Sequence, residues 1–183
     1  MCEIVNKWTS QNKMLQKVKK PILQALNKEK TSTVPLWLMR QAGRHLPEYR
    51  EVRSSTSNFL DFCYNPELAS KVTLQPVSRY GVDAAILFSD ILVIPHALGQ
   101  NVSFVPGSGP VLEPITNINE IKKLNIKDIN VKLSNIYKTV STVKKAINNN
   151  FKTTTLIGFA GSPWTVATYV IEGGSSKDYI NTK

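Results

Sequence analysis

The chain has 183 residues, which is enough for one domain of ordinary size with a hydrophobic core. It carries 23 Lys and Arg against 13 Asp and Glu, and this net charge of +10 favours anionic partners. The lysines are spread through segments that are also rich in Asn and Ile. This scatter indicates solvated helix faces and not a groove that follows a phosphate backbone, so we do not expect a nucleic-acid partner.

The two cysteines, Cys2 and Cys63, cannot form a disulfide framework, and no Cys or His spacing is typical of a metal site. We therefore expect a cytoplasmic, reducing location and no metal. No signal peptide is visible, and residues 1–20 are expected to form a loosely held N-terminal arm. The longest apolar stretch, 84–98, is too short and too polar to cross a membrane.

Three apolar runs have the length and residue types of buried strands: 34–39, 84–88 and 154–159. Between the first two, Asn65 and Pro66 predict an N-cap and first helical position for a helix that runs toward Tyr80. Pro76 is expected to kink that helix or to end it early.

Apolar residues recur at helical spacing between the second and third runs, from Val131 to Ile147, with lysines on the other face. Three asparagines at 148–150 are expected to close this helix. Strands that alternate with helices predict a parallel β/α architecture, because parallel neighbours need crossover connections.

Polar residues follow each predicted strand. Arg40 follows the first strand, Asp90 the second, and Ser162 begins the segment after the third. In open α/β sheets and in β/α barrels, ligands bind at the carboxyl ends of parallel strands. The sequence therefore predicts a single site formed by these segments.

Four of the five arginines fall within residues 35–53, namely Arg40, Arg44, Arg50 and Arg53. Because a guanidinium grips a carboxylate or phosphate with two parallel hydrogen bonds, the cluster suggests a bound polyanion. A surface network with Glu48 and Glu51 explains the same spacing equally well. Between Arg40 and Arg44, Gly43 could supply a backbone conformation that is closed to other residues.

Asp90 has two interpretations. Asp90 or Ser89 could cap a short helix that runs to Leu98, or Asp90 could be a carboxylate at the floor of a site beside Phe88. Further along, Ser162 and Pro163 favour a helix start, and Tyr169 on that helix is by default a core residue with a satisfied hydroxyl.

The remaining local patterns favour structural roles. Residues 106–110 are glycine-rich but lack the ending of a phosphate-binding loop, so they predict a turn. His45 and His96 have no neighbouring nucleophile or ligand pattern, and we expect both to be surface or packing residues.

Longer motifs carry a family resemblance. Residues 35–44 read Pro-Leu-Trp-Leu-Met-Arg-Gln-Ala-Gly-Arg and closely resemble the first signature of the uroporphyrinogen decarboxylase family. Residues 158–173 resemble its second signature, and 83–95 and 105–110 also look like family segments in the family order. The likeness runs from about Ile22 to Lys183, and it departs at His45, where the family usually has tyrosine.

The resemblance implies a (β/α)8 barrel that acts as a homodimer without metal or organic cofactor. The implied reaction, in haem biosynthesis, removes CO2 from the four acetate side chains of uroporphyrinogen III to give coproporphyrinogen III. Residues 21–183 would then be the N-terminal part of one such domain, with about three of its eight strands. The implied substrate contacts are Arg40, Gln41, Ala42, Gly43, Arg44, Arg53, Asp90 and Tyr169.

The resemblance also suggests individual roles. Asp90 would accept the four pyrrole N–H groups and stabilise the charge that develops in the reaction, while Arg40 would lie nearest the reacting acetate. Three alternatives stay open: an inactive remnant that retains at most weak anion or porphyrinogen binding, a methyltransferase relative with zinc ligands, and a nucleic-acid binder.

Overall fold

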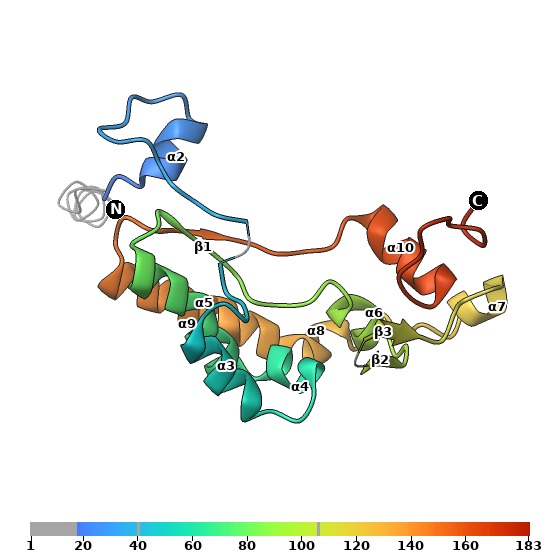
Figure 1. Ribbon diagram of the computed structural model, residues 1–183. Helices are drawn as coiled ribbons and strands as arrows, with labels where there is room; N and C mark the ends of the chain where they lie inside the picture. The colour runs from blue at the N-terminus through green and yellow to red at the C-terminus, as the bar shows by residue number, and fades with distance from the viewer. Residues whose placement is uncertain (1–17, 40, 106) are drawn as a thin grey trace, which may run out of the picture.

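Two parallel strands lie at the centre of the fold, with helices packed along them (Figure 1). The computed structural model describes residues 18–39, 41–105 and 107–183. The strands pair in register from Ala84 opposite Thr155 to Ile86 opposite Ile157. The elements in chain order are α2 (Pro21–Leu26), α3 (Pro47–Ser54), α4 (Phe59–Tyr64), α5 (Pro66–Tyr80), β1 (Ala84–Ile86), α6 (Val93–Ala97), β2 (Val102–Val105), β3 (Gly109–Leu112), α7 (Ile118–Ile121), α8 (Ile129–Lys132), α9 (Ser134–Asn150), β4 (Thr155–Ile157) and α10 (Pro163–Glu172).

Helix α5 begins as its sequence predicts. The Asn65 side chain accepts hydrogen bonds from the backbone N–H groups of Glu67 and Leu68, and Pro66 occupies the first helical position. Gly81 ends the helix in the left-handed conformation, at φ 64°. The prediction that Pro76 ends the helix early is wrong, because α5 continues through it to Tyr80. Pro76 is buried, so packing against the neighbouring elements offsets the hydrogen bond that proline cannot make.

The main core lies between α5, α9 and the strand pair. Val77, Val82, Ala85, Val143 and Ile147 form one buried cluster. Because α9 turns its apolar stripe toward α5, as its periodicity predicts, lysines remain on its solvent side. The predicted start at Val131 is wrong, because this residue lies on α8 and is 74% exposed. Helix α9 ends at Asn150, within the asparagine run that was expected to close it.

The predicted first strand, 34–39, is not a strand in the structure. Leu36 makes two hydrogen bonds with Asp83. The Leu36 carbonyl accepts from the N–H of Asp83 at 2.9 Å, and the N–H of Leu36 donates to Asp83 Oδ2 at 2.8 Å. Because a side-chain oxygen takes the place of a backbone carbonyl, no ladder extends from this point. Val34, Leu38 and Met39 are 91%, 51% and 74% exposed, which also contradicts a buried strand.

A second group of elements comprises the antiparallel β2–β3 hairpin, α6, α7 and α10, at the right in Figure 1. Of the turn predicted at 106–110, Gly107 and Ser108 form a turn between β2 and β3, whereas Gly109 and Pro110 already belong to β3; Pro106 lies outside the described residues. Gly107 and Gly109 have φ angles of 84° and 81°, which favour glycine. The N–H of Leu112 donates to the carbonyl of Gly173 at 2.9 Å, so the hairpin contacts the end of α10.

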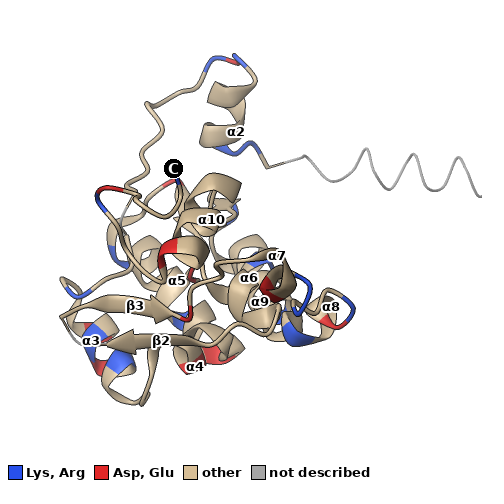
Figure 2. Ribbon diagram, turned by 90° about the vertical axis from the view of Figure 1, so that its right-hand side faces the viewer, with Lys and Arg blue, Asp and Glu red and all other residues tan. Residues whose placement is uncertain are grey.

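Basic residues are spread over the molecule. Figure 2 shows them at separate places, around α3, near α8 and along the segment that carries α2. None of the helices among the described residues combines the length and the apolar character that a membrane span needs.

Candidate active site

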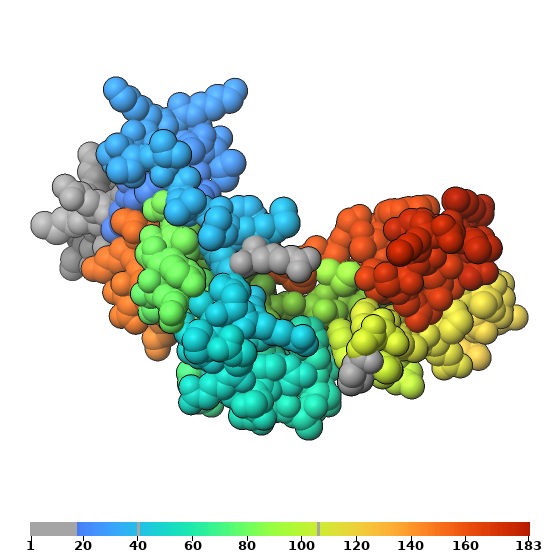
Figure 3. All heavy atoms as spheres, viewed as in Figure 1, coloured from blue at the N-terminus to red at the C-terminus, as the bar shows by residue number. Residues whose placement is uncertain are grey.

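The surface is hollowed between the segment that follows Leu36 and helix α10 (Figure 3). Residues that follow β1 lie at the floor of this hollow. Arg40, one of the two predicted catalytic residues, lies outside the described residues.

Gln41 fixes the segment before α3 to the central strand pair. Its side chain is only 4% exposed, and Nε2 donates to the carbonyl oxygen of Ala84 at 3.0 Å. Its Oε1 is buried and has no partner among the described residues, and the contact of Gln41 with the substrate stays a prediction. Ala42 packs against the cluster that contains Leu46 and Tyr49.

Gly43 does not have the special conformation that its sequence position suggested. Its φ is outside the left-handed region, and a Cβ added there would meet only the His45 ring, at 3.4 Å. The backbone of this turn is therefore open to other residues. A small residue here still leaves room for a ligand, and that role stays a prediction.

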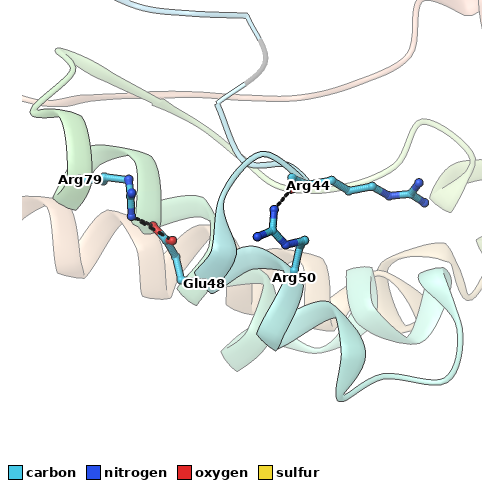
Figure 4. A network of polar contacts seen from close by, with 4 residues as sticks. All are labelled: Arg44, Glu48, Arg50 and Arg79. Atoms are coloured by element: carbon cyan, nitrogen blue, oxygen red, sulfur yellow. Dashed lines mark hydrogen bonds and ion pairs between the residues drawn. The ribbon is translucent and has the colours of Figure 1, made fainter.

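The arginines of α3 and its preceding turn do not pair with nearby glutamates (Figure 4). Glu48 instead pairs with Arg79, whose Nη1 donates to both carboxylate oxygens at 3.2 Å. This is the single ion pair among the described residues. Arg50 Nη1 donates to the backbone carbonyl of Arg44 at 2.8 Å. For Arg44, Arg50 and Arg53, the alternative of a surface network with Glu48 and Glu51 is wrong, and the Arg44 side chain points away from α3.

Arg53 is held by its own neighbourhood. Its Nη1 donates to both the carbonyl and the hydroxyl oxygen of Thr56, each at 2.9 Å. Its guanidinium carbon lies 5.9 Å from the ring centre of Phe59 and 6.0 Å from that of Phe62. These contacts are typical of a residue that joins α3 to α4, although its other nitrogens remain able to bind a ligand.

The prediction that Asp90 or Ser89 caps the helix is wrong, because the N-cap residue of α6 is Leu92 and no side chain of the described residues caps this helix. Asp90 Oδ1 instead accepts from the N–H of Leu92 at 2.8 Å, within the turn that precedes α6. Its role at the floor of a site stays a prediction. The bond from Leu92 is the only hydrogen bond that this carboxylate accepts from the described residues. Burial raises the pKa of Asp90, and the bond from Leu92 only partly opposes this shift. A half-buried carboxylate with one oxygen unengaged can accept donors from a ligand.

Cys63 is a site neighbour that the sequence did not single out. The thiol is fully buried, and burial together with the nearby Asp90 charge raises its pKa to about 12, while Arg53 acts in the opposite direction. Cys63 is therefore a neutral thiol that is close enough to both predicted ligand contacts, Arg53 and Asp90, to feel their charges. Only its apolar helix position was available as a signal, and that pattern describes any core residue.

The residue Phe88 connects Asp90 to an aromatic cluster under the site. Its ring centre lies 4.7 Å from that of Phe62 and 5.9 Å from those of Tyr49 and Phe59. The hairpin joins the cluster through Phe104, whose ring centre is 5.0 Å from Phe59. Pairs at these distances stabilise a fixed arrangement of the rings.

Tyr169 lies on α10, as expected, and packs as a half-buried residue against the cluster that contains Leu60 and Leu92. No hydrogen bond to its hydroxyl comes from the described residues, so the default of a satisfied core tyrosine is wrong in that respect. Ser162 is the N-cap residue of α10 and Pro163 its first residue, but the serine side chain makes no capping bond.

The two histidines lie at the surface, as predicted. His96 Nδ1 is 3.1 Å from the hydroxyl of Tyr64, which itself donates to the carbonyl of Val93. Burial, with Lys132 nearby, lowers the pKa of His96. Within the ranges that the structure describes, no three His, Cys, Asp or Glu residues are grouped as a metal site requires.

An apolar groove of about 730 Å³ separates α7 from α10. Ile115, Ile121, Val170 and Ile171 are among its lining residues. It lies apart from Asp90 and the arginines, none of which line it. We therefore do not assign it to the candidate active site.

The fold defines a class first. Two parallel strands joined by helices, with Asp90 in the segment that follows β1, are part of a (β/α)8 barrel, so the predicted fold class is confirmed. Of the three strands expected for this part of the barrel, two form among the described residues. A solved structure of a methyltransferase from Methanosarcina mazei has a TM-score of 0.61 and 18% identity to this chain. It matches 82% of this chain and 44% of its own, and it supports the fold alone.

The sequence relatives give the family. The model described as "Uroporphyrinogen decarboxylase (URO-D)" matches residues 17–183, and the chain belongs to this family. The proteins named uroporphyrinogen decarboxylase from Rhodospirillum rubrum and Agrobacterium fabrum are each 55% identical, over 167 and 157 residues. These matches cover 91% and 86% of this chain, but 47% and 44% of the relatives. The chain thus spans about half the length of the curated relatives it matches.

Proposed function

We propose that this chain provides part of the active site of a uroporphyrinogen decarboxylase, which removes CO2 from the acetate side chains of uroporphyrinogen III to give coproporphyrinogen III. The observation that carries the proposal is Asp90, a half-buried carboxylate with an unengaged oxygen after β1. The family match and the names of the relatives support the same reaction.

Asp90 would act on the pyrrole rings. Four pyrrole N–H groups of the substrate can converge on the Asp90 carboxylate. The substrate thereby supplies the hydrogen-bond donors that a buried carboxylate needs. Protonation of a ring carbon makes the ring cationic, and the electrons of the bond to CO2 then flow into it. Loss of CO2 neutralises the ring and leaves an exocyclic methylene group. Protonation of this methylene gives the methyl group and makes the ring cationic again, and loss of the proton first added to the ring carbon restores the neutral pyrrole.

The charge of Asp90 would stabilise the cationic ring without having to reorganise. A charge pair at about 4 Å and an effective dielectric constant near 20 is worth roughly 4 kcal/mol. This corresponds to about a thousandfold in rate, so other groups must orient each acetate and deliver the proton.

The arginines would bind the carboxylates of the substrate. Arg44 would hold one of them, since its side chain points away from α3 and from the glutamates (Figure 4). We place Arg40 nearest the reacting acetate, and Tyr169 as a hydrogen-bond donor to another. Arginine is a poor proton donor because its pKa is very high, so water held by Arg40 is an equal candidate for that step.

Further properties of the family belong to the same proposal. We propose that the active form is a homodimer, that it needs no metal or organic cofactor, and that it works in the cytoplasm. The free thiol of Cys63 is compatible with a reducing compartment. Uroporphyrinogen, which carries eight carboxylates, is the expected partner of the arginine-rich segment.

Turnover by the purified chain tests the proposal. Uroporphyrinogen is supplied, and coproporphyrinogen and the partly decarboxylated intermediates are followed. Asp90→Asn keeps the shape and the acceptor for Leu92, and we expect it to lower turnover about a thousandfold. Near-normal turnover in this variant would contradict the role of its charge.

The alternative is a chain that binds the substrate but does not convert it. The chain spans about half the length of its relatives. Turnover is therefore measured in two samples: the purified chain alone, and the chain with added polypeptide corresponding to the rest of a relative. Activity only in the second sample would support the site roles and show that this chain alone is insufficient. Binding without turnover in both samples would favour the inactive alternative.

A further inference from the structure

The turn that carries Asp90 leaves the sheet at one residue. The N–H of Leu87 still donates to the carbonyl of Ile157 at 3.0 Å, and this bond is the last along the strand pair. The next N–H, that of Phe88, donates instead to the hydroxyl oxygen of Thr73 on α5, at 3.0 Å. Thr73 therefore provides the acceptor for the first backbone N–H after β1 that β4 does not pair with.

The hydroxyl of Thr73 is itself fixed. It donates its single hydrogen to the carbonyl of Ala69 at 2.7 Å, so a lone pair is left for Phe88. Thr73 is 1% exposed, so no water competes for these bonds. A β-branched side chain in a helix has few rotamers, which further fixes the oxygen.

We propose that Thr73 is a positioning residue for Asp90, because its hydroxyl bonds α5 to the peptide N–H two residues before the carboxylate. Phe88 is then held twice, by Thr73 at its backbone and by Phe62, Tyr49 and Phe59 at its ring. With Phe88 fixed, the short segment to Asp90 has little freedom. The effect on catalysis rests on the proposed function, whereas the effect on the turn does not.

Thr139 provides a matched control within the chain. It is also 1% exposed, and its hydroxyl donates to the carbonyl of Asn135, four residues earlier in α9, at 3.0 Å. It accepts no bond from another segment among the described residues. Replacing either threonine by valine removes a hydroxyl bonded within its helix, but only Thr73→Val also removes the bond to Phe88.

The experiment compares the isotope-labelled 183-residue chain with Thr73→Val, Thr73→Ser and Thr139→Val. Exchange of the Phe88 amide with solvent is expected to be about tenfold faster in Thr73→Val than in Thr139→Val, and close to the native rate in Thr73→Ser. Equal exchange in the two valine variants would overturn the proposal. If Thr73→Val does not fold, protection of the Phe88 amide in the native chain and its retention in Thr73→Ser decide in the same way.

A second measurement follows the carboxyl carbon of Asp90 by NMR during a pH titration. A loosened turn admits water, so in Thr73→Val the midpoint is expected to move down, toward that of an ordinary aspartate. The titratable neighbour Cys63 stays protonated throughout, since its pKa is about 12. An unchanged midpoint would show that Thr73 supports the fold without positioning Asp90.

Turnover separates this inference from the proposed function. With uroporphyrinogen, Thr73→Val is expected to lower kcat about tenfold with little change in KM, because the arginines remain in place. If Asp90→Asn leaves turnover intact, the proposed function fails, yet the exchange and titration results still decide the role of Thr73. A change confined to KM would contradict the positioning of a charge that acts in the transition state.

Discussion

Helices α9 and α10 flank the same strand, β4, but are covered to very different extents. Helix α9 buries Thr139, Val143 and Ile147 against α5 and the strand pair. Helix α10 buries only Thr168 among the described residues, and its Trp164 is 63% exposed. Because an apolar helix is stable when its apolar face is covered, α10 is the less completely packed of these two helices.

The stability of the described structure lies mainly in the core between α5, α9 and the strand pair. The elements α5, α9, β1 and β4 bury their apolar side chains against one another, whereas α10 borders the apolar groove of about 730 Å³. We expect unfolding of the whole chain to be controlled by the former. Two isoleucines, Ile147 on α9 and Ile171 on α10, allow the same substitution to be made in both regions.

The largest expected difference is between Ile147→Ala and Ile171→Ala. Ile147 is 1% exposed, and its truncation leaves a cavity that is expected to lower the free energy of unfolding by about 2–5 kcal/mol. Ile171 lines the groove, so Ile171→Ala should cost less than about 1 kcal/mol. Urea unfolding measures both. Equal losses would mean that α10 is covered as well as α9.

A smaller effect is expected at Asp90, where the two regions meet. The folded-state pKa is raised by burial, so the folded chain binds protons more tightly than the unfolded chain, and stability decreases as pH rises through this range. At pH 7 the full penalty of burying the charge applies. Asp90→Asn should therefore raise the Tm at pH 7, and this gain should vanish below a pH of about 4. Thermal unfolding at several pH values checks this, and a gain independent of pH would contradict it.

The smallest effect concerns Glu172, at the end of α10. Its carboxylate accepts from the backbone and side chain of both Asn181 and Thr182, and these bonds, led by the Thr182 hydroxyl, lower its pKa. The contact is complete above the ordinary pKa of a glutamate and is lost as pH falls through the lowered value.

We expect Glu172→Gln to speed amide exchange at Asn181 and Thr182 about two- to fivefold. Glu113→Gln serves as the control, because the side chain of Glu113 accepts no bond from the described residues. The same acceleration in both variants would mean that the effect is due to net charge and not to this contact.

The sequence predicts most of the elements around β1 and β4, because their signals are local. Asn65 and Pro66 define the start of α5, and the apolar spacing on α9 identifies its buried face. The run 34–39 has equally good strand composition, yet strand formation also requires a neighbouring backbone to pair with. Only Leu36 pairs with Asp83, and composition could not reveal this.

The types of residue in the candidate site could be predicted from the sequence, but their hydrogen-bond and ion-pair partners could not. The position of Asp90 after a strand was clear, whereas its bond to Leu92 is visible only in the structure. Spacing suggested that Glu48 would pair with arginines of its own segment, but α5 brings Arg79 to it. The contacts of Arg53 with Thr56, Phe59 and Phe62 are close in sequence, but the residue types alone did not single them out as its partners.

The pairing of Glu48 with Arg79 has a kinetic consequence. Since this carboxylate is engaged elsewhere, the positive charges of Arg44 and Arg50 are not cancelled at short range among the described residues (Figure 4). An approaching polyanion is then attracted before it makes contact, which speeds encounter. The association rate of such a ligand should fall steeply as ionic strength rises, while its dissociation rate changes much less.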